Sequence, residues 1–430
     1  MVTRAPFLKT CYGGYFHREV PEEDAELTHV EPGTPCGEYM RRFWQPICFS
    51  DELRDLPRVV KILGEELVVF RDQSGAVGLL ELHCPHRGTS LEFGLIDEKG
   101  IRCCYHGWLF APDGTILETP GEPAESTLKD RLYHGAYPTH EDYGIVFAYM
   151  GPPEQRPRFP AYDSFSRPGY RVIPGQKYFY PCNWLQIMEN AMDPAHTAFL
   201  HTIVSGAVFT SEFGVLPELD FVQTPIGMIY IATRRVGENV WARMVEAVLP
   251  NLQQVAPIWE DGREEHSFSG PMMSRWIVPV DDINTMFIEL RHVSEVEGVT
   301  PAWWADREIM LPGQLAAESR EAGQRHPGDY EAQVSQRPTA IHGLEHLGAT
   351  DRGVTIFRRQ IRRGIRAVES GDGSPEPRRT ADPITPTYCN DTVVRMPPAA
   401  TVIEDRQLMR GTGRQLAETY LKDPPLMKGR

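Results

Sequence analysis

Two cysteines and two histidines between residues 84 and 106 have a spacing that suits a metal centre. Cys84 and His86 form Cys-x-His, and Cys103 and His106 form Cys-x-x-His further along the chain. Zinc sites usually pair their ligands as two cysteines or two histidines, whereas each pair here contains one residue of each type. If the pairs occupy the tips of neighbouring hairpins, both sulfurs can face one metal ion and both nitrogens another.

This layout predicts a [2Fe-2S] centre of the Rieske type, in which two cysteines hold one iron and two histidines hold the other. Neutral imidazoles raise the potential of such a cluster above that of an all-cysteine cluster, so it accepts one electron and passes it on. Gly88 and Gly107 suit tight loops in which backbone N–H groups point at the sulfurs. A structural zinc site and two unrelated hairpins with core cysteines remain alternatives, and Cys104 has no assigned role.

A second group of possible metal ligands lies in the stretch ENAMDPAHTAFLH, which contains Asn190, Asp193, His196 and His201. Two histidines and one carboxylate, with coordination positions left open, form the facial triad with which non-haem Fe(II) activates O₂. On an ideal helix, residues five apart point about 140° away from each other, so the two histidines converge only if the helix is distorted. The alternative is a helix with two polar residues that are satisfied within the protein and bind no metal.

The surrounding sequence predicts the elements that must position these residues. Short apolar runs between residues 61 and 150, separated by Gly and Asp-Gly turns, predict a small all-β unit. The proline-rich stretch 151–160 predicts a linker. Residues 181–201 then have helical spacing, and apolar runs between 221 and 293 predict strands of a larger sheet. Helical patterns return after Pro301 in three stretches: 305–324, 353–370 and 401–423.

Composition limits the class of protein. A length of 430 residues suggests two or three domains. The net charge of -15 argues against nucleic acid or anionic lipid as the main partner. No apolar run approaches the length of a membrane span, and the N-terminus lacks the apolar stretch of a secretory signal, so we expect a cytoplasmic protein without a membrane partner. Eight scattered cysteines do not form a disulfide framework.

The motifs resemble those of one enzyme family. Cys-Pro-His-Arg-Gly at 84–88 and Cys-x-Tyr-His-Gly-Trp at 103–108 resemble the N-terminal domain of the Rieske non-haem iron ring-hydroxylating oxygenases. Asp-x2-His-x4-His at 193–201 resembles the catalytic motif of the same family. HGLEHLGATDRGVTIFRR, residues 342–359, is similar to the alpha (oxygenase) subunits of the phthalate-dioxygenase-like branch. The resemblance spans most of the chain.

The resemblance implies a fold and a domain order. We expect an α+β protein with an all-β Rieske [2Fe-2S] domain and a helix-grip-like catalytic domain, in which helices cover an antiparallel sheet. The expected boundaries are an N-terminal arm over residues 1–40, the Rieske domain over 41–152, and the catalytic mononuclear non-haem iron domain over 160–430.

The resemblance also implies roles for particular residues. It assigns the cluster to Cys84, His86, Cys103 and His106, and a mononuclear Fe(II) to His196 and His201. Asp329 is the expected third iron ligand, because Asp-x3-Gln-x-Ser matches a segment of that branch, although Gly328 stands where the branch often has an acid. Asn190 and Asp193 are expected in the catalytic machinery, with Asp193 linking the iron to His106 of a neighbouring subunit. The rival third ligands are Asp306, Glu308, Glu318 and Glu331.

By the same resemblance, the chain is expected to use O₂ and electrons from a separate reductase to hydroxylate an aromatic substrate, expected to be a carboxylate. That reductase is expected to carry flavin and a [2Fe-2S] centre, and the chains are expected to form a homo-trimer or stacked trimers. The alternatives are oxidative O-demethylation of a methoxy-aryl acid, and a Rieske electron-transfer protein without oxygenase activity. Candidates to receive the electron donor are Arg58, Lys61, Arg87 and Arg102, and candidates to bind a carboxylate are Arg234, Arg235, Arg243 and Arg291.

Overall fold

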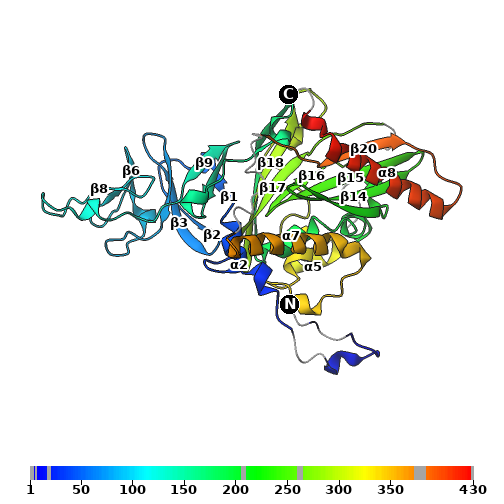
Figure 1. Ribbon diagram of the computed structural model, residues 1–430, viewed down its shortest axis with the longest axis horizontal. Coiled ribbons are helices and arrows are strands. Elements are labelled where there is room, and N and C mark those ends of the chain that lie inside the picture. Colours follow the sequence, from blue (N-terminus) through cyan, green and yellow to red (C-terminus); the bar gives the residue numbers. More distant parts are fainter. Residues whose placement is uncertain are drawn as a thin grey trace.

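The chain forms two β-rich parts that follow each other along the longest axis of the molecule (Figure 1). The computed structural model describes residue 4 and residues 7–16, 21–204, 210–258, 265–371 and 384–427. The smaller part, blue to cyan in Figure 1, has three antiparallel sheets. Their strands are β1 (Trp44–Phe49), β10 (Ile145–Tyr149) and β9 (Thr139–Asp142); β2 (Arg58–Ile62), β3 (Glu65–Arg71) and β4 (Val77–Glu81); and β5 (Leu95–Asp97), β6 (Gly100–Arg102), β7 (Leu109–Phe110) and β8 (Ile116–Glu118).

The larger part is built on one antiparallel sheet of eight strands. Most residues of its central strands are buried, as expected for a sheet that is covered on both faces. The spatial order is β12 (Tyr170–Tyr180), β18 (Asn284–Ser294), β17 (Met273–Asp281), β16 (Leu252–Val255), β15 (Asn239–Val248), β14 (Gly227–Val236) and β13 (Glu218–Thr224), with β20 (Asn390–Arg395) paired to β15. A short parallel pair, β11 (Ala161–Tyr162) with β19 (Ile384–Thr385), lies outside this sheet.

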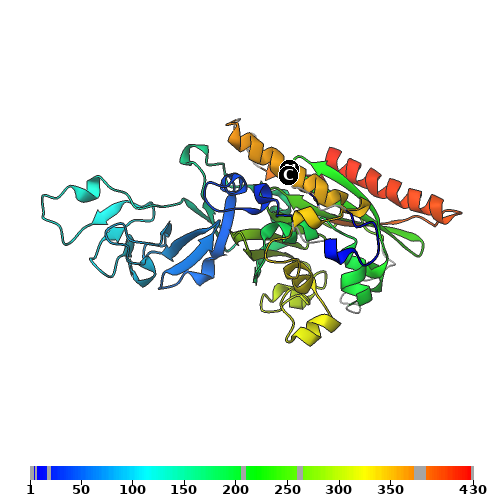
Figure 2. The ribbon, with the colours of Figure 1, turned by 90° about the horizontal axis from the view of Figure 1, so that it is seen from below.

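Helices cover both faces of this sheet, which Figures 1 and 2 show with α7 (Arg352–Glu369) in orange and α8 (Val402–Lys422) in red. Helix α8 packs on Ile229 and Ile231 of β14. The core that contains α3 (Trp184–Asn190) and α7 includes Tyr230 and Ala232 of the same strand. Because successive residues of a strand point to opposite faces, the two sets of helices lie on opposite sides of the sheet. The predicted α+β class is confirmed.

Two of the three predicted C-terminal helical stretches are confirmed as α7 and α8, and the prediction for 305–324 is wrong. In that stretch only α5 (Arg320–Arg325) is an α-helix. Pro312 and Gly313 interrupt the pattern, and Gly313 has φ +74°, a left-handed conformation that a helix cannot contain. The remaining short helices are α1 (Ala25–Thr28), α2 (Pro35–Met40), α4 (His196–Ala198) and α6 (Asp329–Val334).

The N-terminal segment packs on the larger part. The Trp184 indole donates to the carbonyl of Leu27 at 3.2 Å, and the Asn183 amide donates to that of Thr28 at 2.8 Å. On α7, a Cβ added at Gly364 would lie 2.2 Å from the Tyr39 ring, so α2 and α7 are in close contact. The predicted N-terminal arm therefore packs on the larger part, while the exact domain boundaries stay a prediction.

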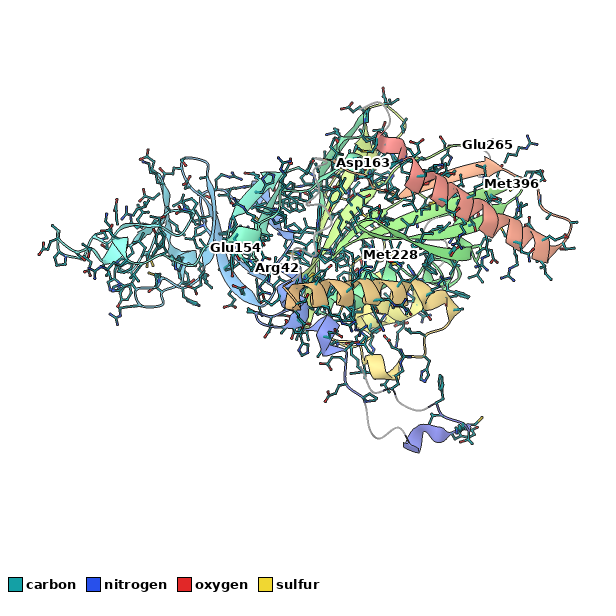
Figure 3. All side chains as sticks on the ribbon, viewed as in Figure 1. Arg42, Glu154, Asp163, Met228, Glu265 and Met396 are labelled. Atoms are coloured by element: carbon teal, nitrogen blue, oxygen red, sulfur yellow. The ribbon has the colours of Figure 1, made fainter. Side chains whose placement is uncertain are left out.

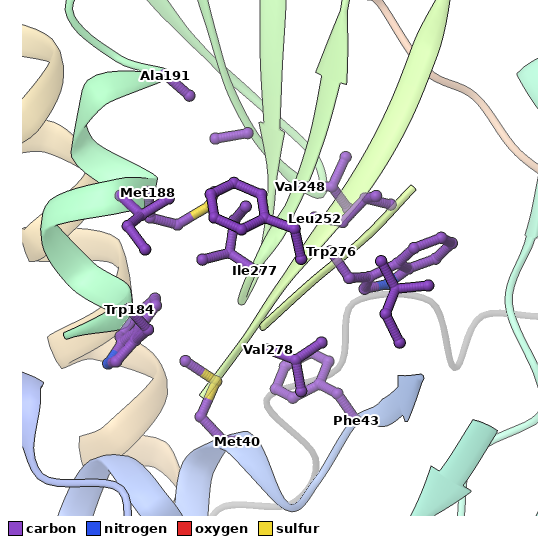
Figure 4. Close-up of a cluster of buried hydrophobic side chains, with 14 of the residues drawn as sticks. Met40, Phe43, Trp184, Met188, Ala191, Val248, Leu252, Trp276, Ile277 and Val278 are labelled. Atoms are coloured by element: carbon purple, nitrogen blue, oxygen red, sulfur yellow. The ribbon is translucent and has the colours of Figure 1, made fainter. Parts of the chain in front are cut away.

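One hydrophobic core joins the two parts of the chain. Figure 4 shows Met40 and Phe43 from the N-terminal side next to Trp184 of α3 and Trp276 and Val278 of β17. Figure 3 shows side chains filling the junction between the two parts, where Arg42 and Glu154 are labelled. Helix α3 is thereby fixed against the sheet. Within the described residues, no helix combines the length and apolar character needed to cross a membrane.

Candidate metal centres

The four residues of the first predicted site lie on two loops with the same hydrogen-bond pattern. One loop follows β4, and the other joins β6 to β7. Gly88 N–H donates to the carbonyl of Cys84 at 2.8 Å, and Gly107 N–H donates to that of Cys103 at 3.0 Å. Both glycines have positive φ, +78° and +73°, which other residues adopt only with strain. The two loops therefore present their cysteine and histidine side chains in an equivalent way.

The two cysteine side chains lie together on one side of the gap between these loops, and the two histidine side chains lie together on the other side. Cys84 and Cys103 are both only 3% exposed and lie within hydrogen-bonding contact of each other. The imidazole rings of His86 and His106 have centroids 4.4 Å apart, and Trp108 stacks on His86 at 4.9 Å. His86 Nδ1 is buried without a hydrogen-bond partner in the described part of the chain. Sulfur thus lies on the inner side and nitrogen on the outer side.

This arrangement fits a two-iron cluster better than a single zinc ion. A tetrahedral zinc needs four donor atoms around one point. Among the described residues, no three of these four place their donor atoms within 4.8 Å of one another, although the residues of the second site do. Two sulfurs on one side and two nitrogens on the other match the ligand sets of the two irons of a Rieske cluster.

Electrostatics acts in opposite ways on the two kinds of candidate ligand: it disfavours the thiolate of Cys84 and favours the neutral imidazole of His106. Burial, together with the neighbouring Cys103, raises the pKa of the Cys84 thiol to about 11, while backbone N–H groups of His86 and Arg87 act in the opposite direction. Bound iron must therefore displace protons from the thiols. Burial and the nearby His86 and Arg87 lower the pKa of His106, which favours the neutral imidazole that binds metal.

A π-helix brings together the two histidines of the second site. His196 begins α4, and a π-helix over Phe199–Val204 follows directly and carries His201. The i→i+5 hydrogen bonds of a π-helix align residues five apart, which a regular α-helix does not. The two imidazole centroids lie 5.2 Å apart with a 71° angle between the rings. The helix is distorted, as the convergence of the two histidines requires, and the assignment of these histidines to a metal stays a prediction.

The third donor next to these histidines is Asp329, the first residue of α6. Its Oδ1 lies 3.4 Å from His201 Nε2 and 3.9 Å from His196 Nε2. The donor atoms of the three residues all lie within 4.8 Å of one another. Burial raises the pKa of Asp329, but His201, His196 and Arg275 outweigh it and hold that pKa below its usual range. The carboxyl group is therefore ionised, as a metal ligand must be.

The rival acids do not reach this point. Asp306, Glu308 and Glu318 are exposed. The carboxylate of Glu331 accepts hydrogen bonds from the N–H groups of Gly328 at 2.9 Å and Ala317 at 2.8 Å, so it caps the start of α6.

Asn190 and Asp193 lie around the three donors without joining them. Asn190 Nδ2 lies 3.4 Å from Asp329 Oδ1. Asp193 contacts the far side of the His196 ring: its Oδ2 is 3.8 Å from Nδ1, which also hydrogen-bonds the Asp193 carbonyl. The Asp193 side chain is 31% exposed. Asp193 therefore orients His196 and remains accessible from outside.

The sequence did not predict the residues that hydrogen-bond Asp329 through Oδ2, the carboxylate oxygen other than the one closest to the histidines. Gln314 Nε2 donates to Asp329 Oδ2 at 2.5 Å, and Arg275 donates to Gln314 Oε1 at 3.0 Å. Gln314 precedes Asp329 by fifteen residues and Arg275 lies on β17, so no spacing rule connects them. Only the tertiary fold identifies this group.

A second set of possible donors, Glu189, His342 and Glu345, also gathers within 4.8 Å. The guanidinium of Arg358 donates to both carboxylates at 2.5 to 2.8 Å. The Arg358 guanidinium therefore already lies between the carboxylates, where a metal ion would have to bind. The group is therefore an ion-pair network that supports α3 from the side of α7.

Comparison with known proteins identifies the class. Residues 43–132 match the family described as Rieske [2Fe-2S] domain, and residues 148–304 match LigXa C-terminal domain like. The chain is 42% identical to the tert-butanol monooxygenase / tert-amyl alcohol desaturase oxygenase subunit of Aquincola tertiaricarbonis, covering 95% of this chain and 91% of that one. It is 39% identical to the phenoxybenzoate dioxygenase subunit alpha of Ectopseudomonas oleovorans, covering 86% and 91%.

Solved structures share the fold. The crystal structure of dicamba monooxygenase bound to 3,6-dichlorosalicylic acid superimposes with a TM-score of 0.59 at 18% identity, covering 77% of this chain and 98% of that one. With the relatives above, this places the protein among oxidoreductases that combine a Rieske cluster with a mononuclear iron. The chain belongs to the Rieske non-haem iron oxygenases, as an oxygenase subunit.

Two adjacent cysteines provide a matched test of the cluster site. Cys103 is buried against Cys84, whereas Cys104 is exposed. We expect Cys103→Ser to abolish the visible absorption and the EPR signal of the reduced cluster, and Cys104→Ser to leave both unchanged. Iron and acid-labile sulfide assays check the composition of the wild-type protein. Zinc without sulfide, or a normal spectrum in Cys103→Ser, would contradict the assignment.

Proposed function

We propose that His196, His201 and Asp329 hold the mononuclear iron and that Cys84, His86, Cys103 and His106 hold the cluster. The observation that carries the first assignment is the convergence of two imidazoles and one ionised carboxylate on one point. Two histidines and a carboxylate leave coordination positions open for other ligands. When bound, the iron supplies O₂ activation, and the cluster supplies the electrons that this requires.

Removal of the carboxylate tests the iron site. We expect Asp329→Ala to lower total iron from about three to about two per chain, because the mononuclear site loses a ligand and the cluster does not. Glu318→Ala, which changes an exposed acid in the preceding loop, serves as the control and should keep the full iron content. Metal analysis and the cluster EPR signal measure both sites separately. Full iron content in Asp329→Ala would refute the assignment.

The proposed substrate is an aromatic carboxylate. The four arginines considered as its binding partners fall into two pairs, which differ in whether they form a close ion pair with an acidic side chain of the protein. Arg291 is fully buried and pairs with Glu289 at 2.8 Å. Arg235 pairs with Asp405 at 2.5 Å on the side of α8. Both charges are thus already compensated within the protein. Neither arginine is suited to bind a substrate anion.

Arg234 and Arg243 are different, because they are buried and form no close ion pair with an acidic side chain in the described part of the chain; the buried Asp391 acts on Arg234 only from further away. Arg234 is 1% exposed; it donates to the Val215 carbonyl and to Thr197 Oγ1, and its Nη1 has no partner there. Arg243 donates to the Tyr230 hydroxyl at 2.7 Å and to two carbonyl oxygens. Burial lowers the pKa of Arg234 to about 10, so this guanidinium remains a cation at neutral pH.

Arg234 contacts aromatic rings and the segment that carries the proposed iron ligands. Thr197, which Arg234 contacts, follows His196 in the chain. The Arg234 guanidinium lies 5.1 Å from the ring centroids of both Phe213 and Trp241, and the Phe213 ring is 6.4 Å from that of His201. An aromatic ring with a carboxylate would meet complementary groups here. This favours a substrate like that named for the phenoxybenzoate relative over a neutral alcohol.

A single turnover of reduced, iron-loaded protein under ¹⁸O₂ tests the substrate class. The panel contains benzoates, phenoxybenzoates, phthalates and methoxybenzoates, with tert-butanol as the neutral competitor. We expect a labelled product from an aromatic acid. A diol with two labelled atoms indicates dihydroxylation, and formaldehyde with a free phenol indicates demethylation.

Adjacent arginines provide the variants for the same assay. Arg234→Met should raise KM for the acid about 30-fold or more, since the carboxylate loses a buried charged partner. Arg235→Met removes a charge that is already paired with Asp405 and should leave KM unchanged. Turnover of tert-butanol alone, or equal KM values in both variants, would contradict the aromatic-acid proposal.

Electron transfer is proposed to run between chains of a head-to-tail homo-trimer, fed by a separate reductase that carries flavin and a [2Fe-2S] centre. The support is that His106 lies on the outer side of the cluster loops and that the partly exposed Asp193 contacts His196.

Of the four cations expected to receive the donor, three pair with acids: Arg58 with Glu52, Lys61 with Asp281, and Arg102 with Asp97 and Glu118. Arg87 has no acidic partner among the described residues and lies 5.9 Å from the Tyr105 ring centroid.

Asp193→Asn tests the proposed link between the two metals. We expect both metals to be retained and the oxidation of the reduced cluster by O₂ and substrate to slow about 10- to 100-fold, because the bridging carboxylate supports His196. Stopped-flow absorption measures this rate, and light scattering gives the oligomeric state. A monomer with full activity would exclude transfer between chains.

A further inference from the structure

A closed chain of buried polar contacts connects Asp329, a proposed iron ligand at the start of α6, to α3, the helix that precedes the two proposed histidine ligands. Gln314 Nε2 donates to Asp329 Oδ2 at 2.5 Å, and Arg275 Nη1 donates to Gln314 Oε1 at 3.0 Å. Arg275 Nε donates to Gln253 Oε1 at 2.7 Å, and Gln253 Nε2 donates to the Ile187 carbonyl at 3.3 Å. Ile187 lies in α3, whose residue Asn190 closes the chain at Asp329 Oδ1.

Arg275 determines which way the Gln314 amide faces. A guanidinium only donates hydrogen bonds, so the amide oxygen must face Arg275 and the amide NH₂ group must face Asp329. Arg275 is itself held by Gln253 and lies 5.3 Å from the Phe287 ring centroid. Gln314, Arg275 and Gln253 are 6%, 8% and 0% exposed, so water competes little for these contacts.

The backbone brings Gln314 to Asp329 through a close contact between two glycines. A Cβ added at Gly328 would lie 2.4 Å from Gly313 Cα, and the Tyr330 N–H donates to the Gly313 carbonyl at 3.1 Å. The Tyr180 hydroxyl also donates to the Gln314 carbonyl at 2.9 Å. Gly328 is therefore required by the packing of this loop, which accounts for the absence of an acid at that position.

We propose that Gln314, oriented by Arg275, is a positioning residue that occupies Oδ2 of Asp329 and leaves Oδ1 for the iron. Oδ1 is the oxygen that faces both imidazoles, at 3.4 and 3.9 Å from their Nε2 atoms. Gln314 thereby favours binding through one carboxylate oxygen and keeps a coordination position open. This inference rests on the proposed ligand role of Asp329.

The test measures iron binding in two variants. Gln314→Met keeps the side-chain volume and removes the donor, while Gln314→Asn keeps the amide but is too short to contact both Asp329 and Arg275. We expect each variant to weaken Fe(II) binding about 10- to 100-fold in a chelator competition. We also expect a changed EPR spectrum of the Fe(II) protein treated with nitric oxide, since the coordination of Asp329 changes.

Gln360→Met is the matched control, because Gln360 is a buried glutamine of α7 that donates to the Gly227 carbonyl and is outside this chain of contacts. It should keep the wild-type affinity and spectrum, and all variants should keep the cluster EPR signal. Fe(II) binding within twofold of wild type in both Gln314 variants, or an equal loss in Gln360→Met, would overturn the proposal. Normal Fe(II) binding by Asp329→Ala would instead overturn the ligand assignment itself, so the two failures are distinguishable.

Discussion

The larger part of the chain depends on one interaction, between the buried carboxylate of Asp329 and the imidazoles of His196 and His201. Asp329 is 5% exposed, and an ionised carboxylate taken out of water costs several kcal/mol unless it is paired and hydrogen-bonded. Its partners come from different parts of the chain: His196 and His201 from the distorted helix, Asn190 from α3, and Gln314 from the loop before α5. Two backbone features bring these partners to Asp329: the π-helix and the contact between Gly313 and Gly328.

The same physical rule separates the buried cations that pair with acids from those proposed to bind substrate. A buried guanidinium needs compensation, and Arg291 and Arg358 obtain it from glutamates. Among the described residues, Arg234 and Arg243 donate hydrogen bonds only to neutral groups, and the nearby Asp391 forms no close ion pair with Arg234. The overall charge of -15 therefore gives no guide to the local charge near the proposed iron ligands. Burial together with the lack of a close ion pair among the described residues is the useful signal, and only a structure provides it.

Site residues that are close together in the sequence could be predicted from it, whereas those far apart in the sequence could not be predicted from spacing. That the four residues proposed for the cluster lie together could be predicted, because they belong to two short loops whose glycines close the same turn. His196 and His201 were predictable as a pair, together with the need for a distorted helix. Asp329 is far along the chain, so it followed from a family resemblance and not from spacing. Gln314 and Arg275 left no pattern, because their contacts exist only once β17 and the loop before α5 are packed.

The error in the stretch 305–324 has an informative cause. Apolar periodicity favoured a helix, but Pro312 and Gly313 break it, and the resulting loop is what carries Gln314 to Asp329. A regular helix would have satisfied local propensity and left the buried carboxylate without its second partner. Where local preference and a buried charge conflict, the larger free energy comes from the charge, because an unpaired buried ion costs more than the loss of a few helical residues. Departures from helical pattern near buried acids are therefore useful places to look for residues that position metal ligands.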